Sequence, residues 1–429
     1  MKKALVLAGG GTKGIYQVGA IEALKEIGED DWSIITGTSV GALNAAMLVQ
    51  GDFDRMVDMY EHLQADQIVN GFVPNPEDMT ITNFIRERER FIPSLKAWIK
   101  DRGVDIRPFK ENMASYYVPE RFFASDIDFG CITAEAKGHG GVYVTKEMMK
   151  EHGLEWLIAS ASAYPAFPMT NIDGTDYIDG GYFDNFPIDF ALRLGAEKVI
   201  AIDLESTPAH PNFIGRENIV YIKPHKDLFS FLDFDKVKMN QARRCGYLDV
   251  MKKFGILYGE RYAFSPFHRP AFFDEWYRSV MMLETRVALA GNLSEQLNSR
   301  QVITDRLKSQ LHVDHLHPRQ YLYGMLDALM DACSLEEVKV YTYEEARNRI
   351  LAAFSEALNE DYFVPSLNVV DIASYLTSLD TFGIIAKLIH CHFYPDHMAG
   401  FENVILTVAP FEYALSELAA FMMKELAWE

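Results

Sequence analysis

Long apolar runs are missing from this chain of 429 residues. No stretch reaches the ~18 uninterrupted apolar residues that a membrane-spanning helix needs. The N-terminal run Met1–Ala8 begins like a signal peptide, but it stops at Gly9, too early for the apolar segment of such a leader. We therefore expect neither a membrane span nor a secretory leader, and we expect a cytoplasmic protein.

Cysteine and positive charge are also scarce. The 4 cysteines lie far apart and form no CxxC pair, which predicts reduced, buried thiols rather than a disulfide framework. The chain has 41 basic and 61 acidic residues, a formal net charge of −20. Such an acidic chain repels polyanions, which argues against a nucleic-acid partner and against strong docking on anionic membranes. A transient contact with a membrane surface stays compatible with this charge.

The composition that remains is that of an ordinary globular protein, with 49% hydrophobic and 24% charged residues. In residues 1–265, short β-branched or apolar runs alternate with helical patterns. This alternation predicts a mainly parallel sheet covered by helices on both faces. The expected strands are Ala4–Ala8, Ile34–Gly37, Phe129–Ala134, Val142–Thr145, Tyr177–Asp179, Val199–Asp203 and Val220–Ile222.

The pattern changes near residue 265. Ser265–Pro270 is typical of a linker, and long amphipathic helical patterns such as Glu344–Leu358 and Phe411–Leu426 follow it. We predict an α/β domain over residues 1–265 and a mostly helical region over residues 266–429, whose role the sequence does not define. Residues 71–120 interrupt the first domain with prolines and charges, a pattern that fits either a lid or a solvated surface excursion.

The sharpest motif is Gly37-Thr38-Ser39-Val40-Gly41, which follows an expected strand and precedes a run of good helix formers. A nucleophile elbow needs this arrangement, because the serine occupies a strained turn where strand and helix approach closely. Gly37 and Gly41 would permit that approach. Ser39 is therefore the candidate nucleophile.

A second motif, Gly9-Gly10-Gly11-Thr12-Lys13-Gly14, directly follows the first expected strand. It fits a G-x-G-x-x-G dinucleotide fingerprint, and it also fits an oxyanion hole whose donors come from Gly9, Gly10, Gly11 and Gly14. A nucleotide site requires an acid at the end of the second strand to bind the ribose, but Ser39 follows that strand here. The oxyanion hole is the favoured interpretation.

An elbow serine needs a base, and Asp179 ends an apolar segment directly before Gly180 and Gly181. The two glycines let the backbone turn sharply, whereas the earlier Asp173-Gly174 is typical of an ordinary turn. An aspartate can act as general base if it is ionised and lies ~2.6–3.2 Å from the hydroxyl. With an aspartate base we expect no acidic limb near ~6.5, the pKa of free histidine.

With these elements in this order, the chain resembles the patatin-like phospholipases over residues 1–255. The family's glycine-rich motif corresponds to Gly9–Gly14, its nucleophile to Ser39 and its D-G-[AG] motif to Asp179–Gly181. Ala159–Pro168 also resembles a small-residue, proline-ending segment of that family. Lys13 stands where family members more often carry arginine, which keeps the charge but not the planar fork.

The resemblance implies a three-layer α/β/α domain, a Ser–Asp dyad, no metal or other cofactor, and lipid acyl esters as substrates. Neither the exact lipid, the acyl position cleaved nor the oligomeric state follows from it.

Three alternatives remain open from the sequence. A Ser–Asp–His esterase would use His210 or His225 as its base. A nucleotide-binding protein would use the glycine loop. A metal site is conceivable at His390–His392 with Asp396 and His397, or at His312, His315 and His317.

Overall fold

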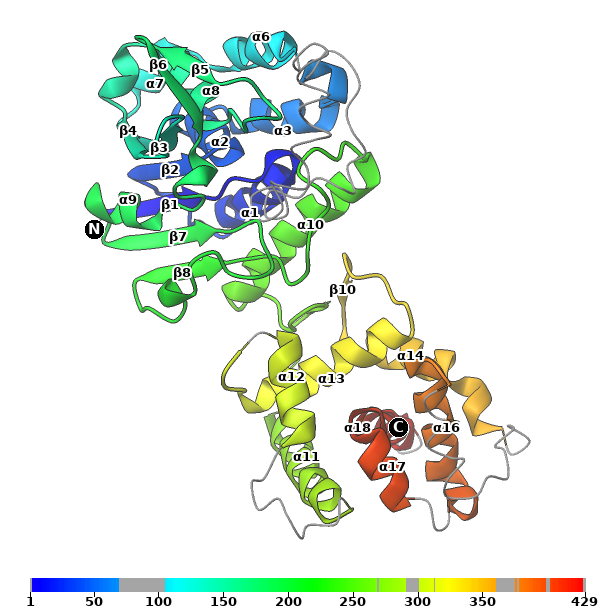
Figure 1. Ribbon diagram of the computed structural model, residues 1–429. Helices are drawn as coiled ribbons and strands as arrows, with labels where there is room; N and C mark the ends of the chain where they lie inside the picture. The colour runs from blue at the N-terminus through cyan, green and yellow to red at the C-terminus, as the bar shows by residue number, and fades with distance from the viewer. Residues whose placement is uncertain are drawn as a thin grey trace. The chain divides into compact units, whose positions relative to one another are not determined.

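The computed structural model divides into two compact units, Met1–Lys253 and Phe254–Glu429 (Figure 1). By compactness the division falls after Lys253, and the domain boundary at residue 265 stays a prediction. The structure describes residues 2–68, 105–267, 270–290, 301–311, 313–359, 375, 378–398 and 402–426.

An 8-stranded sheet forms the centre of the first unit, in the order β5-β6-β3-β2-β1-β7-β8, with β4 also paired to β3 (Figure 1). β1, β2, β3, β7 and β8 are parallel to their neighbours in that group, whereas β4, β5 and β6 pair antiparallel. Each of the seven expected strands is present, and the short β5 adds to them. The strands are β1 (Lys3–Leu7), β2 (Ile34–Thr38), β3 (Asp128–Glu135), β4 (Gly141–Thr145), β5 (Thr170–Ile172), β6 (Thr175–Asp179), β7 (Lys198–Ile202) and β8 (Ile219–Ile222).

Helices α2 (Val40–Val49) and α9 (Ile188–Arg193) cover opposite faces of this sheet. Thr36 on β2 donates its hydroxyl hydrogen bond to the carbonyl oxygen of Pro187, directly before α9, at 3.2 Å. The next residue, Gly37, faces α2, because a Cβ built on it would lie 2.3 Å from the Gly41 carbonyl oxygen. Successive strand residues point to opposite faces. The predicted three-layer α/β/α architecture is therefore confirmed.

The remaining helices of this unit surround α2 and the sheet edge. A short 3₁₀ turn, η1 (Gly11–Gly14), leads into α1 (Ile15–Glu26), which packs closely on α10 (Lys236–Lys253). A Cβ on Gly19 would meet the Arg243 carbonyl oxygen at 1.8 Å, so the two helix backbones nearly touch. The others are α3 (Phe53–His62), α6 (Arg107–Tyr116), α7 (Pro119–Ala124) and α8 (Gly153–Ser160).

The segment 71–120, for which the sequence left open a lid or a solvated surface excursion, falls largely outside the described residues, which resume at 105. The described part contains α6 and the start of α7. Phe109 of α6 lies 5.8 Å, between ring centroids, from Phe167. The choice between a lid and a surface excursion stays open.

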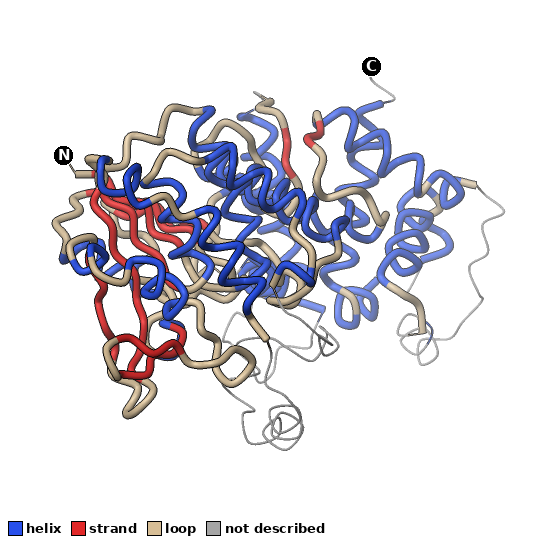
Figure 2. The backbone as a smooth tube through the Cα atoms, turned by 90° about the horizontal axis from the view of Figure 1, so that it is seen from above, coloured by secondary structure: helices blue, strands red, loops and turns tan. Residues whose placement is uncertain are grey.

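The second unit is mostly helical, as predicted, and Figure 2 shows helices over most of its described length. Its two short strands, β9 (Ala263–Phe264) and β10 (Val340–Tyr341), pair in parallel. The expected helices at 344–358 and 411–426 correspond to α14 with the 3₁₀ turn after it and to α18. The helices are α11 (Pro270–Ala290), α12 (Val302–Leu311), α13 (Pro318–Ala332), α14 (Tyr343–Ala353), α16 (Thr381–Phe393), α17 (Glu402–Val408) and α18 (Pro410–Leu426).

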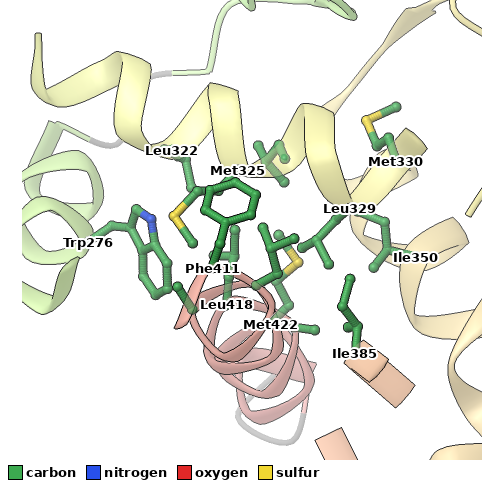
Figure 3. Close-up of a cluster of buried hydrophobic side chains, with 14 of the residues drawn as sticks. Trp276, Leu322, Met325, Leu329, Met330, Ile350, Ile385, Phe411, Leu418 and Met422 are labelled. Atoms are coloured by element: carbon green, nitrogen blue, oxygen red, sulfur yellow. The ribbon is translucent and has the colours of Figure 1, made fainter. Parts of the chain in front are cut away.

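The core of this unit draws on several helices and includes the contact between α13 and α18 (Figure 3). Leu322 and Leu329 of α13 point toward Phe411 and Leu418 of α18, and all four side chains are at most 2% exposed. Burial of such apolar area stabilises the packing of the helices. Among the described residues, no single helix is both long and apolar enough to span a bilayer. In the described ranges, only α17 and α18 together reach that composition, and they are bent by 115° at the break between them.

Candidate active site

Ser39 occupies a strained turn between β2 and α2. Its φ of 54° and ψ of −128° place a non-glycine residue in a sparsely populated region of backbone space. The flanking glycines permit the turn, because a Cβ on Gly41 would lie 2.2 Å from the Leu7 carbonyl oxygen. The strand–turn–helix context predicted for Gly37–Gly41 is present, and Ser39 is buried to 7% exposure.

Both backbone polar groups of Ser39 are already hydrogen-bonded. Its N–H donates to the hydroxyl oxygen of Ser160 at 3.0 Å. Its carbonyl oxygen accepts from the N–H groups of Ala42 at 2.9 Å and Leu43 at 3.3 Å, in the first turn of α2. The hydroxyl group is thus the part of Ser39 left for chemistry. The sequence indicated only the segment Ala159–Pro168 as a family resemblance and did not single out Ser160.

Asp179 ends β6, which pairs antiparallel with β3. Its Oδ1 accepts from the Gly181 N–H at 2.7 Å. Its Oδ2 is buried and forms no hydrogen bond of ordinary geometry with any described residue. One carboxylate oxygen is thereby oriented by the turn, and the other is left for a proton.

The pKa of Asp179 is raised from 3.8 to about 6. Burial of the carboxylate is the main cause. Hydrogen bonds from the Gly181 N–H and the neighbouring Ser39 hydroxyl partly offset this rise, because they stabilise the charged form. A base with this pKa is ionised at neutral pH and still accepts a proton readily. This raised pKa changes the expectation for the pH profile: with Asp179 as base, an acidic limb near pH 6 is expected, close to the histidine value.

The glycine loop passes directly beside Ser39. A Cβ on Gly9 would lie 3.0 Å from the Ser39 Cβ and 2.3 Å from Oδ1 of Asn185. Asn185 holds this part of the loop: its Nδ2 donates to the Gly9 carbonyl oxygen at 3.1 Å, and its own carbonyl oxygen accepts from the Gly9 N–H at 3.0 Å. The Gly9 N–H is therefore already used, and Asn185 is a site residue that the sequence analysis missed.

Three backbone N–H groups near Ser39 have no acceptor. Within the described part of the chain, the N–H groups of Gly10, Gly11 and Val40 form no hydrogen bond. Val40 begins α2, where a helix leaves its first N–H groups unpaired and favours negative charge. Gly14 lies farther along the loop, against Tyr60 and the Val40 side chain.

Contacts on its outer side fix the conformation of the loop. The Thr12 N–H donates to the Phe231 carbonyl oxygen at 2.8 Å, and a Cβ on Gly11, which has a φ of +59°, would lie 2.1 Å from that same oxygen. The buried Lys13 ammonium pairs with the Glu205 carboxylate at 2.9 Å. Only glycine fits at position 11, which explains why the loop is glycine-rich there.

The two candidate histidines contact other carboxylates. His210 Nε2 lies 3.1 Å from Asp184 Oδ1, and the hydrogen bond with Asp184 raises the pKa of His210. His225 Nδ1 lies 3.6 Å from Asp249, which also accepts from the Tyr16 hydroxyl at 2.8 Å. The structure brings neither histidine into hydrogen-bond contact with Ser39.

The candidate metal ligands of the second unit are engaged separately. His390 Nδ1 lies 3.0 Å from the Ala357 carbonyl oxygen, and His392 Nε2 lies 2.9 Å from the Ser416 hydroxyl. Across the described ranges, no group of three His, Cys, Asp or Glu side chains is placed to hold a metal ion. His312 lies outside those ranges.

The fold and these residues define an α/β domain with a glycine-flanked serine elbow beside a buried carboxylate. Residues 5–192 match the family model for patatin-like phospholipase. This part of the chain is a patatin-like phospholipase domain, and the matched range is shorter than the 1–255 over which the sequence resembles the family.

Two relatives and one solved structure illustrate the similarity. Patatin-like phospholipase domain-containing protein 7 of Rattus norvegicus is 30% identical over 205 residues, which cover 47% of this chain and 14% of that protein. Lysophospholipase nte1 of Aspergillus terreus is 30% identical over 207 residues, 47% of this chain and 12% of that protein. The crystal structure of VipD from Legionella pneumophila aligns over 96% of this chain and 91% of that one, with 13% identity and a TM-score of 0.37. The chain thus spans a small part of the length of these curated relatives.

Proposed function

We propose that the chain is a serine acyl hydrolase that cleaves fatty-acyl esters of lipids, with Ser39 as nucleophile and Asp179 as general base. The observation that carries the proposal is the Asp179 carboxylate, buried next to the Ser39 elbow with its Oδ2 unpaired and its pKa at about 6. A buried carboxylate with one oxygen left without a hydrogen bond is costly and is retained where it has a function.

The proposed reaction proceeds through an acyl-enzyme. Asp179 takes the Ser39 hydroxyl proton as the serine oxygen bonds to the ester carbonyl carbon, and the carbonyl electron pair moves onto oxygen. When this intermediate collapses, the bond to the alcohol breaks and the alcohol leaves with the proton from Asp179. Water then repeats the sequence, losing its proton to Asp179, and releases the fatty acid while the proton returns to Ser39.

The oxyanion would accept hydrogen bonds from the N–H groups of Gly10 and Gly11, with Val40 as a further donor. These donors have no acceptor among the described residues, so they give up no hydrogen bond to those residues when the negative charge forms. One such donor typically contributes ~3–4 kcal/mol to the transition state.

The substrate class rests on the family and its relatives. The matched family is described as a phospholipase, and the Aspergillus relative is named a lysophospholipase. These names support phospholipids and lysophospholipids as substrates. They do not separate the two.

The test is hydrolysis by the purified full chain. We would incubate the protein with a mixed lipid extract, identify the species consumed by mass spectrometry, and measure turnover of a short p-nitrophenyl ester in parallel. Ser39→Ala and Asp179→Asn are expected to lower kcat by roughly 10²–10⁴-fold or more while leaving the circular dichroism spectrum unchanged. Substantial activity in either folded variant would reject the dyad.

A further inference from the structure

The segment at the end of α8 contacts the backbone of both proposed catalytic residues. It belongs to the small-residue stretch Ala159–Pro168. Ser160 and Ser162 are 0% and 1% exposed, although serine is usually found at the surface. Buried polar groups need hydrogen-bond partners, and each of these two serines has one partner at the site: the Ser39 N–H for the Ser160 hydroxyl and the Asp179 N–H for the Ser162 carbonyl oxygen.

Ser160 joins the elbow to the neighbouring strand. Its hydroxyl donates to the Ile132 carbonyl oxygen of β3 at 2.6 Å and accepts from the Ser39 N–H at 3.0 Å. A hydroxyl can donate one hydrogen bond and accept others. The Ile132 carbonyl therefore fixes the direction of the Ser160 proton, which turns a lone pair toward Ser39.

Ser162 contacts Asp179, the second proposed catalytic residue, through the Ser162 main-chain carbonyl group. Its carbonyl oxygen accepts from the Asp179 N–H at 2.8 Å and from the Tyr164 N–H at 2.7 Å. Its hydroxyl is used elsewhere, on the Ile158 carbonyl oxygen and the Thr170 hydroxyl, both at 2.8 Å. Ser160 and Ser162, two residues apart in one chain segment, thus accept the hydrogen bonds of the Ser39 N–H and the Asp179 N–H.

We infer that residues 160–162 form a clamp that sets the positions of Ser39 and Asp179 relative to each other, with Ser160 as a positioning residue. The inference rests on the proposed function. A serine with positive φ keeps that conformation only where its surroundings impose it, and the Ser160 hydroxyl is the group that satisfies its N–H. The same bond removes the Ser39 N–H from the oxyanion donors and leaves that task to Gly10, Gly11 and Val40.

Proton transfer and attack depend steeply on such positioning, because a displacement of about 1 Å can cost on the order of 100-fold in rate. Ser160→Ala removes the acceptor for the Ser39 N–H without adding volume. It should therefore lower kcat for a p-nitrophenyl ester by roughly ten- to hundredfold, with KM changed by less than about twofold.

Ser416→Ala is the matched control. Ser416 is also fully buried, and its hydroxyl also makes two hydrogen bonds, to the Tyr413 carbonyl oxygen at 2.7 Å and to His392 Nε2 at 2.9 Å, but it belongs to the second unit. This variant should keep the kcat of the wild type. Hydrogen exchange gives a second readout: in the full chain, exchange of the Ser39 amide should be at least about tenfold faster in Ser160→Ala and unchanged in Ser416→Ala.

The outcomes separate the two proposals. Wild-type kcat in Ser160→Ala, an equal loss in both variants, or unchanged exchange at Ser39 would each overturn the clamp. A wild-type protein that hydrolyses no lipid or nitrophenyl ester would refute the hydrolase, and the exchange measurement would still decide whether Ser160 holds the Ser39 backbone.

Discussion

Asp179 pairs with Thr133 on β3, one residue along that strand from Ile132, the partner of Thr38 on β2. This register brings the end of β6 to the end of β2. Ser39 follows Thr38 directly, so residues that lie far apart in the chain meet at one edge of the sheet. Strand pairing, rather than any local motif, thus positions the carboxylate next to the hydroxyl.

The pH profile of kcat/KM should show an acidic limb near pH 6. The pKa of Asp179 is raised to about 6, and the general base must be ionised, so activity falls as pH drops below that value. The limb should persist in the His210→Asn variant, since the titrating group is Asp179. A profile that stays flat down to pH 5 would contradict this assignment of the base.

The same shift has a consequence for stability. The folded-state pKa of Asp179 lies above its ordinary value, so the folded protein binds this proton more tightly than the unfolded chain does. Its stabilising contribution is present below about pH 4 and is lost as pH rises through about 6, a difference of roughly 3 kcal/mol. Asp179→Asn should therefore raise the urea midpoint at pH 8 relative to wild type, with a smaller gain at pH 4. An equal effect at both pH values would show that the buried charge is not the cause.

Gly180→Ala should abolish most activity. A Cβ there would lie 2.2 Å from the Ile132 carbonyl oxygen and 2.9 Å from Cγ2 of Thr38, so β3 or the turn after Asp179 must move. We expect a loss of kcat of at least about 100-fold and roughly 1–3 kcal/mol of stability. Gly140→Ala is the control, because its Cβ would meet nothing within 4 Å. Full activity of Gly180→Ala would show that the site tolerates a shifted turn.

Replacing the candidate histidines separates the dyad from a triad. His210→Asn and His225→Asn should each change kcat by less than about threefold, because each ring contacts Asp184 or Asp249 and neither contacts Ser39. A Ser–Asp–His esterase would instead lose on the order of 10³-fold or more. Turnover of the p-nitrophenyl ester at pH 8 is the measurement.

Leu329→Ala should destabilise the helical unit. Leu329 is 0% exposed and points into the cluster between α13 and α18 (Figure 3). Removing a buried leucine side chain typically costs ~2–5 kcal/mol, so the thermal transition of this unit should move to lower temperature. Met282→Ala, at a side chain that is 70% exposed, should leave the transition within about 0.5 kcal/mol. Equal transitions in both variants would argue against this cluster as the core.

The sequence by itself determined the local elements around the site. Ser39 lies in a strand–turn–helix unit, and Asp179 ends an apolar strand before two glycines, because propensity and glycine spacing act over a few residues. Asp173-Gly174 also forms the expected turn, with φ values of 49° and 84°. β5, the strand that pairs with β6 across this turn, was not predicted, because three residues are too few to show the alternation of apolar and polar side chains typical of a strand.

Only the tertiary structure decided what surrounds those elements. The pKa of Asp179 depends on burial by distant segments, so it could not be derived from the residues beside it, and the expected pH profile changes for that reason. The roles of Ser160 and Asn185 arise from hydrogen bonds that span 121 and 176 residues of chain. A sequence motif indicates the local backbone conformation of a residue. The hydrogen bonds and desolvation of that residue depend instead on which distant groups the sheet brings next to it.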